Sequence, residues 1–184
     1  MAGREDRLMR KVALLGSINV GGNRVKMADL RSAFESAGFA DVATVTASGN
    51  VLFDDHGSGD AEERIAALLV DEFGIESFAA VRSSAELAKA LEENPFTGSG
   101  ADNLVHTMFL EGQPDAEAFA QLQADHQGRG REKLAPGTCA LHIDYVDGAG
   151  SSKLTKNFIE RRLGCRGTAR NIHSIRRIME AMEK

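Results

Sequence analysis

The sequence predicts an α+β fold in which one pattern, βαββαβ followed by an additional helix, occurs twice. Three observations support this prediction. Apolar residues alternate between strand-like and helix-like spacing, glycines follow the helical segments, and the same order of segments restarts after a Gly- and Pro-rich stretch at residues 95–103. A chain of 184 residues is long enough for two small domains.

The first copy lies before residue 95. Its predicted segments are, in order, a strand at 11–18, a helix with Met27, Leu30, Phe34 and Ala37 on one stripe, strands at 42–47 and 51–54, a helix at 61–73, a strand at 77–81 and a helix ending at Asn94. Gly38 and Gly74 stand where the first two helices should end.

The second copy follows residue 103. Its predicted segments are a strand at 104–110, a helix at 115–124, a strand pair at 128–133 and 139–144 around Pro136-Gly137, a helix at 153–163, an edge strand at 166–170 and a helix with Ile172, Ile175, Met179 and Met182. Two βαββαβ strings of this kind assemble naturally as ferredoxin-like domains. We therefore predict tandem ferredoxin-like domains, at residues 10–96 and 103–184.

Composition excludes several classes of protein. With 42% hydrophobic and 27% charged residues, the chain has enough apolar residues for ordinary cores. The charged first residues have no apolar run typical of a signal peptide, and the longest apolar runs are too short to span a membrane, so we expect a cytoplasmic protein. Cys139 and Cys165 are far apart and lack ligand spacing, which favours two small buried residues over a disulfide or a zinc site.

The net charge of −5 is unevenly distributed along the chain. Residues 151–184 contain nine Lys/Arg and three Glu, a balance of +6, which leaves residues 1–150 at −11. The basic segment is either a solvated helical face or an anion-binding surface. The acidity of the rest argues against a general nucleic-acid binder.

The loop after the first predicted strand, GSINVGGN at 16–23, resembles phosphate-binding motifs only in part. It has the GxxxxG spacing of a P-loop, but Gly22-Asn23 stand where the Lys and Ser/Thr are required. The GxGxxG of a dinucleotide-binding fold is also missing. No motif indicates a cofactor, and the simplest interpretation is a turn between strand and helix that uses glycine at positive φ.

Topology nevertheless suggests a binding site at this loop. In a ferredoxin-like sheet the loop after the first strand and the turn between the second and third strands emerge at the same end. The groups brought together there are Asn19, Gly21, Gly22, Lys26, Ser48 and Asn50. They are predicted either to bind a small ligand or to hydrogen-bond one another and brace the edge of the domain.

A second candidate site lies in the basic segment. With Ser151 or Ser152 as N-cap, the helix at 153–163 begins with Lys153, Thr155 and Lys156 and no carboxylate. Cations at the positive end of a helix favour a bound anion. The fourth strand of the same domain ends at this edge, so Arg170 and Asn171 are expected nearby. The alternatives are a solvated helix end, or Lys153 paired with an acid of the first domain.

Catalytic residues cannot be named from the sequence. His106 and His142 fall on neighbouring predicted strands and could meet, but no third metal ligand is evident, so we predict no metal site. No Ser-His-Asp order, Cys-His pair or close carboxylate pair stands out. The chain has no Trp and one Tyr, which argues against base stacking on either sheet.

Several motifs together resemble a bacterial family of unknown function, DUF1697. They are LLGSINVGG at 14–22, Lys26, Met27 and Leu30, SGNVLF at 48–53, NPF at 94–96, KLTKNFIERRLG at 153–164 and TARNI at 168–172. The resemblance implies tandem ferredoxin-like domains and no particular reaction. Three positions depart from the family pattern. Gly16-Ser17 replace an Arg-Gly, Lys156 replaces an Asn and Ile172 replaces a Trp, so a cation of the family's first loop is absent here.

These observations lead to three functional hypotheses. The first is a protein that binds a small phosphate- or carboxylate-bearing ligand at its polar edges or in an interdomain cleft. The second is an enzyme acting on a phosphorylated or nucleotide-like substrate, with Lys153, Arg170 and Asn171 as electrostatic stabilisers. The third is an interaction module whose basic segment binds nucleic acid or an acidic protein. We expect no membrane partner.

Overall fold

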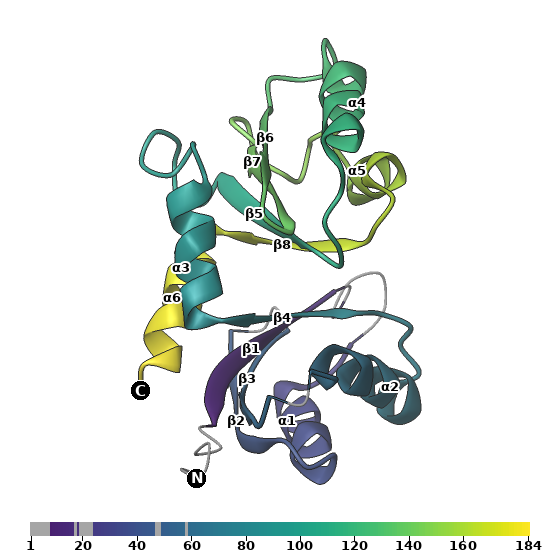
Figure 1. Ribbon diagram of the computed structural model, residues 1–184, viewed down its shortest axis with the longest axis vertical. Helices are drawn as coiled ribbons and strands as arrows, with labels where there is room; N and C mark the ends of the chain where they lie inside the picture. Colours follow the sequence, from purple (N-terminus) through teal and green to yellow (C-terminus); the bar gives the residue numbers. More distant parts are fainter. Residues whose placement is uncertain (1–7, 17, 19–23, 47–48, 58) are drawn as a thin grey trace, which may run out of the picture. The chain divides into compact units, whose positions relative to one another are not determined.

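The computed structural model describes residues 8–16, 18, 24–46, 49–57 and 59–184. The chain divides into two compact units (Figure 1), an N-terminal unit of residues 1–84 with 178–184 and a C-terminal unit of residues 85–177. The predicted limits of the independently folding domains, residues 10–96 and 103–184, stay a prediction. Within the described ranges, every helix is too short or too polar to cross a membrane.

The N-terminal unit contains one antiparallel sheet and two helices that pack on it. Its elements are β1 (Met9–Leu15), α1 (Met27–Ser36), β2 (Ala40–Val45), β3 (Asn50–Asp55), α2 (Ala61–Phe73) and β4 (Ala79–Ser83). The strand order is β2-β3-β1-β4, in which β1 pairs with both β3 and β4. Phe34 of α1 and Phe53 of β3 meet in the core between the helices and the sheet.

The C-terminal unit repeats this arrangement after a leading helix. Its elements are α3 (Ser84–Glu93), β5 (Val105–Leu110), α4 (Ala116–His126), β6 (Lys133–Gly137), β7 (Ala140–Asp144), α5 (Lys156–Leu163), β8 (Gly167–Asn171) and the start of α6 (Ile172–Met182). The strand order, β6-β7-β5-β8, is equivalent to that of the first sheet. The predicted fold of two βαββαβ domains, each followed by a helix, is therefore confirmed.

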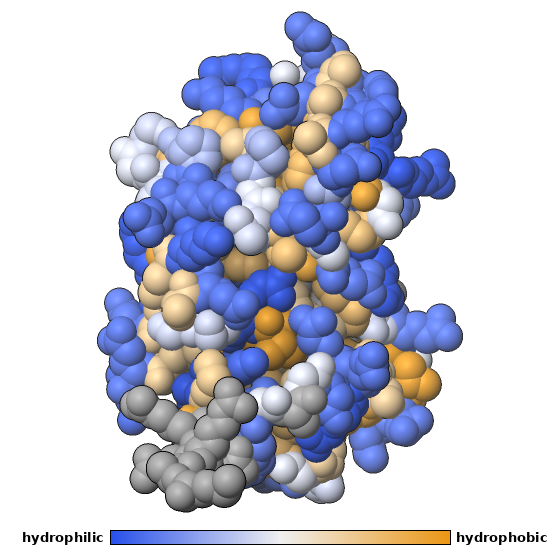
Figure 2. All heavy atoms as spheres, viewed as in Figure 1, coloured by the Kyte–Doolittle hydropathy of each residue, from blue (hydrophilic) through white to orange (hydrophobic). Residues whose placement is uncertain are grey.

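The core of the C-terminal unit lies between its sheet and helices α4 and α5. Leu110, Leu141 and Ile143 of the sheet are buried against Leu122 of α4 and Ile159 of α5. Hydrophilic side chains cover much of the face in Figure 2. Among the large hydrophobic side chains of the described ranges, the exposed ones are Leu8, Met9 and Val70.

Two predicted helix ends are confirmed in detail. Gly74 follows α2 with φ 64°, and Gly164 follows α5 with φ 73°. Both are left-handed C-caps, a conformation that glycine adopts at little cost because it lacks a Cβ atom.

The first strand of the second hairpin was predicted wrongly. The strand does not occupy 128–133 but Lys133–Gly137, and it contains Pro136, which the sequence pattern places in the turn. The turn falls at Thr138 and Cys139 instead, and Cys139 has φ 46°. Proline is tolerated because β6 is an edge strand, where an outward-facing residue needs no N–H donor.

The two cysteines are also more accessible than predicted. Cys139 and Cys165 are not joined in a disulfide, and both are of intermediate exposure rather than buried core residues. Cys139 lies in the turn before β7, and Cys165 lies between α5 and β8, at the borders of the sheet where side chains are only partly covered.

Candidate functional site

The first predicted binding edge is only partly within the described residues. β1 and β3 are antiparallel neighbours, and the Leu15 N–H donates to Gly49 O at 2.9 Å, so the end of β1 does meet the β2–β3 turn. Asn50 is buried, and its Nδ2 donates to Val45 O and Thr46 Oγ1, both at 3.1 Å. These bonds brace the turn.

Of the other residues predicted at that edge, Lys26 lies within the described part of the chain. Lys26 is exposed and immediately precedes α1. Asn19, Gly21, Gly22 and Ser48 lie outside the described residues.

At the second predicted site, helix α5 has a different N-cap from the one expected. The N-cap of α5 is Thr155, whose Oγ1 accepts from the Phe158 N–H at 3.2 Å, and not Ser151 or Ser152. Ser152 Oγ instead donates to the Glu132 carboxylate. Lys153 is exposed and precedes the helix, and the first turn of α5 contains no acidic residue.

Arg170 and Asn171 lie at the end of β8. Across β5, Arg170 neighbours Thr107 and Asn171 neighbours His106. Arg170 is buried, and its Nη1 donates to Thr168 Oγ1 at 2.7 Å and to Ala169 O at 2.9 Å. Burial lowers the pKa of Arg170 to about 10, so it stays charged at neutral pH. Asn171 Oδ1 accepts from the Ser174 N–H at 2.8 Å and thereby caps α6.

His106 and His142 do not meet, contrary to the sequence-based expectation. His142 pairs across the sheet with Thr107, and His106 pairs with Ile143, so the offset of one residue points the two imidazoles to opposite faces. The His106 ring packs edge-on against Tyr145. Within the described ranges, no group of three or more His, Cys, Asp and Glu side chains is arranged to hold a metal ion.

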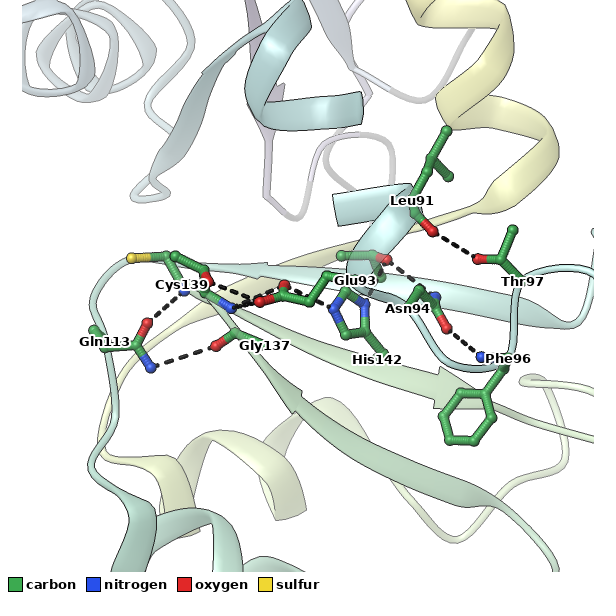
Figure 3. Close-up of polar contacts among 11 residues, drawn as sticks. Leu91, Glu93, Asn94, Phe96, Thr97, Gln113, Gly137, Cys139 and His142 are labelled. Atoms are coloured by element: carbon green, nitrogen blue, oxygen red, sulfur yellow. Dashed lines mark hydrogen bonds and ion pairs between the residues drawn. The ribbon is translucent and has the colours of Figure 1, made fainter. Parts of the chain in front are cut away.

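A chain of hydrogen-bonded polar groups that the sequence did not predict runs from α3 into the sheet (Figure 3). His142 Nε2 lies 3.1 Å from Glu93 Oε2, and His142 Nδ1 lies 2.9 Å from Thr107 Oγ1. Asn94 Nδ2 is 3.4 Å from the same Thr107 oxygen. His142 and Thr107 have no exposed surface.

Protons can be assigned along this chain. A carboxylate only accepts, so His142 Nε2 carries the proton and donates to Glu93. His142 Nδ1 then accepts from the Thr107 hydroxyl, whose oxygen accepts from Asn94. Burial lowers the pKa of His142, and Glu93 opposes this only in part, so the imidazole is neutral at neutral pH.

The order of hydroxyl, imidazole and carboxylate is that of a catalytic triad. Thr107 is 0% exposed, however, and a substrate cannot reach its hydroxyl. The chain of bonds therefore positions Glu93 rather than activating a nucleophile.

Glu93 is held from a second side by the β6–β7 turn. Its carboxylate accepts from the Thr138 N–H at 3.0 Å and from Thr138 Oγ1 at 2.7 Å. Burial alone would raise the pKa of Glu93, but the bonds from Thr138 and His142 outweigh burial and hold this pKa below its ordinary value. Glu93 is therefore ionised at neutral pH.

Gly137 makes room for this arrangement. A Cβ atom at this position would lie 2.6 Å from His142 Nε2 and 2.8 Å from Glu93 Oε2. Gln113 holds the same turn, because its Oε1 accepts from the Cys139 N–H at 2.6 Å and its Nε2 donates to Gly137 O at 3.4 Å (Figure 3).

Glu93 lines a cavity of about 520 Å³, which we call the Glu93 cavity. The cavity lies between the start of α4, the β6–β7 turn and the end of α3. Its polar lining residues are Glu93, Gln113, Gln123 and Thr138. Its apolar lining residues are Pro114, Ala116, Phe119, Ala120 and Pro136, with Gly137 beside them.

A second cavity of about 660 Å³ shares Ala120 and Gln123 with the first. It contains a buried pair, His126 and Glu132, whose side chains are each 8% exposed and whose Nε2 and Oε2 lie 3.4 Å apart. Neither His126 Nδ1 nor Glu132 Oε2 has a hydrogen-bond partner among the described residues. Gln123 Nε2 donates to Leu134 O at 3.2 Å, so α4 is joined to β6 between the two cavities.

One signal in the sequence pointed toward Glu93. The NPF motif at 94–96 begins with Asn94, whose Oδ1 accepts from the Phe96 N–H at 2.9 Å to form a turn at the end of α3. This turn fixes the end of the helix that carries Glu93.

The fold and the site define a class of protein. Both units have the strand order and helix placement of the ferredoxin-like fold, so the chain is a tandem ferredoxin-like α+β protein with a cavity lined by Glu93 in its second unit. The family described as "Protein of unknown function (DUF1697)" matches residues 8–141, and the chain belongs to this family. The motifs at 153–164 and 168–172 lie beyond the matched segment.

A solved structure supports the fold. The conserved bacterial protein SP0830 from Streptococcus pneumoniae is similar, with a TM-score of 0.70 and 19% sequence identity over 97% of this chain and 100% of that chain. At this identity the likeness shows the fold alone. No curated protein matches the chain.

Proposed function

We propose that this protein binds a small organic molecule in the Glu93 cavity. The observation that carries the proposal is the position of Glu93. Its carboxylate lines the cavity and accepts hydrogen bonds from Thr138 and His142, which keep it in place. Binding sites for small molecules typically combine apolar walls with a few polar groups that packed neighbours keep in place. The Glu93 cavity has this composition.

We expect at least one compound of a fragment library to shift the backbone amide resonances of Gly137, Thr138 and Gln113 saturably. The measurement is a ¹⁵N–¹H NMR titration of the full chain. Ala116 is exposed and lines the cavity, so Ala116→Trp should block it and abolish binding. Ala88 is exposed on α3 and does not line it, so Ala88→Trp should leave binding unchanged. If no fragment shifts these amides, the proposal is wrong.

A second candidate is the anion site predicted at the start of α5. The observation that favours it is a first helical turn that contains no acid and begins with exposed Lys156, with exposed Lys153 preceding the helix. A phosphate- or carboxylate-bearing ligand there would be a binding partner or the substrate of an enzyme that uses Arg170 and Asn171. Inorganic phosphate should then raise the melting temperature, and Lys153→Ala should remove this effect. An equal response of the variant would rule the site out.

A further inference from the structure

The charge of the Glu93 cavity limits what it can bind. Of the described residues that line the cavity, Glu93 alone is charged. The other polar groups are the neutral side chains of Gln113, Gln123 and Thr138. An anionic ligand would therefore meet an ionised carboxylate and no compensating cation, which is unfavourable at the short distances inside a cavity.

Glu93 also remains accessible to a ligand in the cavity. An ionised carboxylate offers about four acceptor positions. The described donors to Glu93 are the Thr138 N–H, which lies 3.0 Å from both carboxylate oxygens, the Thr138 hydroxyl and His142 Nε2, so each oxygen has two contacts. The side chain is 28% exposed, in contrast to His142 at 0%. An ammonium group in the cavity can thus approach the exposed part of the carboxylate and pair with its charge.

The rest of the wall is apolar. Phe119 and Ala120 of α4 lie on one side, and Pro114 and Pro136 lie beside them. This surface suits a hydrocarbon or aromatic group but provides no ion pair. The lining therefore combines one fixed negative charge with a surface for an apolar body.

We infer that the Glu93 cavity selects a protonated primary amine with a small apolar or aromatic body, whose ammonium group donates to the Glu93 carboxylate. This inference rests on the proposed function and names its class of ligand. An ammonium group is attracted to the carboxylate as an opposite charge in addition to donating a hydrogen bond, whereas a neutral hydroxyl supplies only the hydrogen bond. Shape alone would not discriminate between an amine, an alcohol and an acid on the same ring.

The test uses three probes of the same shape: benzylamine, benzyl alcohol and benzoate. In ¹⁵N–¹H NMR titrations of the full chain at neutral pH, benzylamine should shift the Gly137 and Thr138 amides saturably. Benzyl alcohol and benzoate should bind at least tenfold more weakly. Glu93→Gln should weaken benzylamine at least tenfold. Glu92→Gln makes the same charge change on the exposed neighbouring residue of α3 and should have no effect.

A second variant tests the charge without altering the bonds of Glu93. Ala116→Lys places a cation at the cavity and should weaken benzylamine while improving benzoate. If benzoate or benzyl alcohol binds the unchanged protein as tightly as benzylamine, the inference is wrong although the cavity binds small molecules. If other fragments bind and benzylamine does not, the inference is also wrong. If no fragment binds at all, the proposed function fails with it.

Discussion

Gly137→Ala is expected to reduce the free energy of unfolding of the C-terminal unit by about 2 kcal/mol. The added methyl would lie 2.6 Å from His142 Nε2 and 2.8 Å from Glu93 Oε2. Glu93 can move its carboxylate. The His142 ring is fully buried and hydrogen-bonded to Thr107, so it cannot move without losing packing contacts and this hydrogen bond. Relief of the clash therefore separates Glu93 from His142 or displaces the β6–β7 turn.

Tyrosine emission provides a local measurement of this effect. Tyr145 is the only Tyr of a chain without Trp, and it is buried within the C-terminal unit. Its emission during urea denaturation therefore reports the unfolding of that unit. Gly112→Ala is the matched control, since its Cβ would meet nothing within 4 Å, and it should shift the midpoint only slightly. Equal midpoints for the two variants would contradict the prediction.

His142→Ala should cost more, about 3 kcal/mol. The substitution removes a fully buried ring and leaves a void in the sheet face. It also deprives the Thr107 hydroxyl of its acceptor and Glu93 of one donor. Both effects lower the free energy of unfolding, because the void removes packing contacts and the unsatisfied groups lose hydrogen bonds.

The same urea experiment tests this second variant. His173 is an exposed histidine at the start of α6, and His173→Ala should change the free energy of unfolding by less than about 0.5 kcal/mol. If His142→Ala proved as mild as this control, the polar chain would contribute little to the unit. Thr107→Val should fall between the two, because it removes one hydroxyl and keeps the volume filled.

The fold could be predicted largely because its signals are local. The apolar stripe of α2 and the glycine at position 74 predict a helix at residues 61–73, and α2 lies there. Strand β6 was misplaced because Pro136 is read as a turn residue unless the strand is known to lie at an edge. The N-cap of α5 was misplaced because Ser152 and Thr155 are equally good caps in sequence, and only the contact of Ser152 with Glu132 separates them.

The Glu93 cavity could not be predicted in the same way. Glu93, Thr107 and His142 come from a helix and two strands, and their contact depends on the pairing of β5 with β7. A register shifted by one residue would send His142 to the other face. The sequence pointed to His142 as a possible partner of His106. His142 contacts Glu93 and Thr107 instead, and of these only Glu93 had a signal nearby in the sequence, the NPF motif.

The β6 edge of the second sheet is built in a way that opposes aggregation. A strand edge with unpaired N–H and C=O groups is a template for aggregation. On β6, Pro136 has no N–H to offer, and Gln123 and Gln113 already donate to the carbonyl oxygens of Leu134 and Gly137. An extended segment of another chain would therefore find few free backbone groups along β6. The residues that wall the cavity also protect this edge against amyloid-like strand addition.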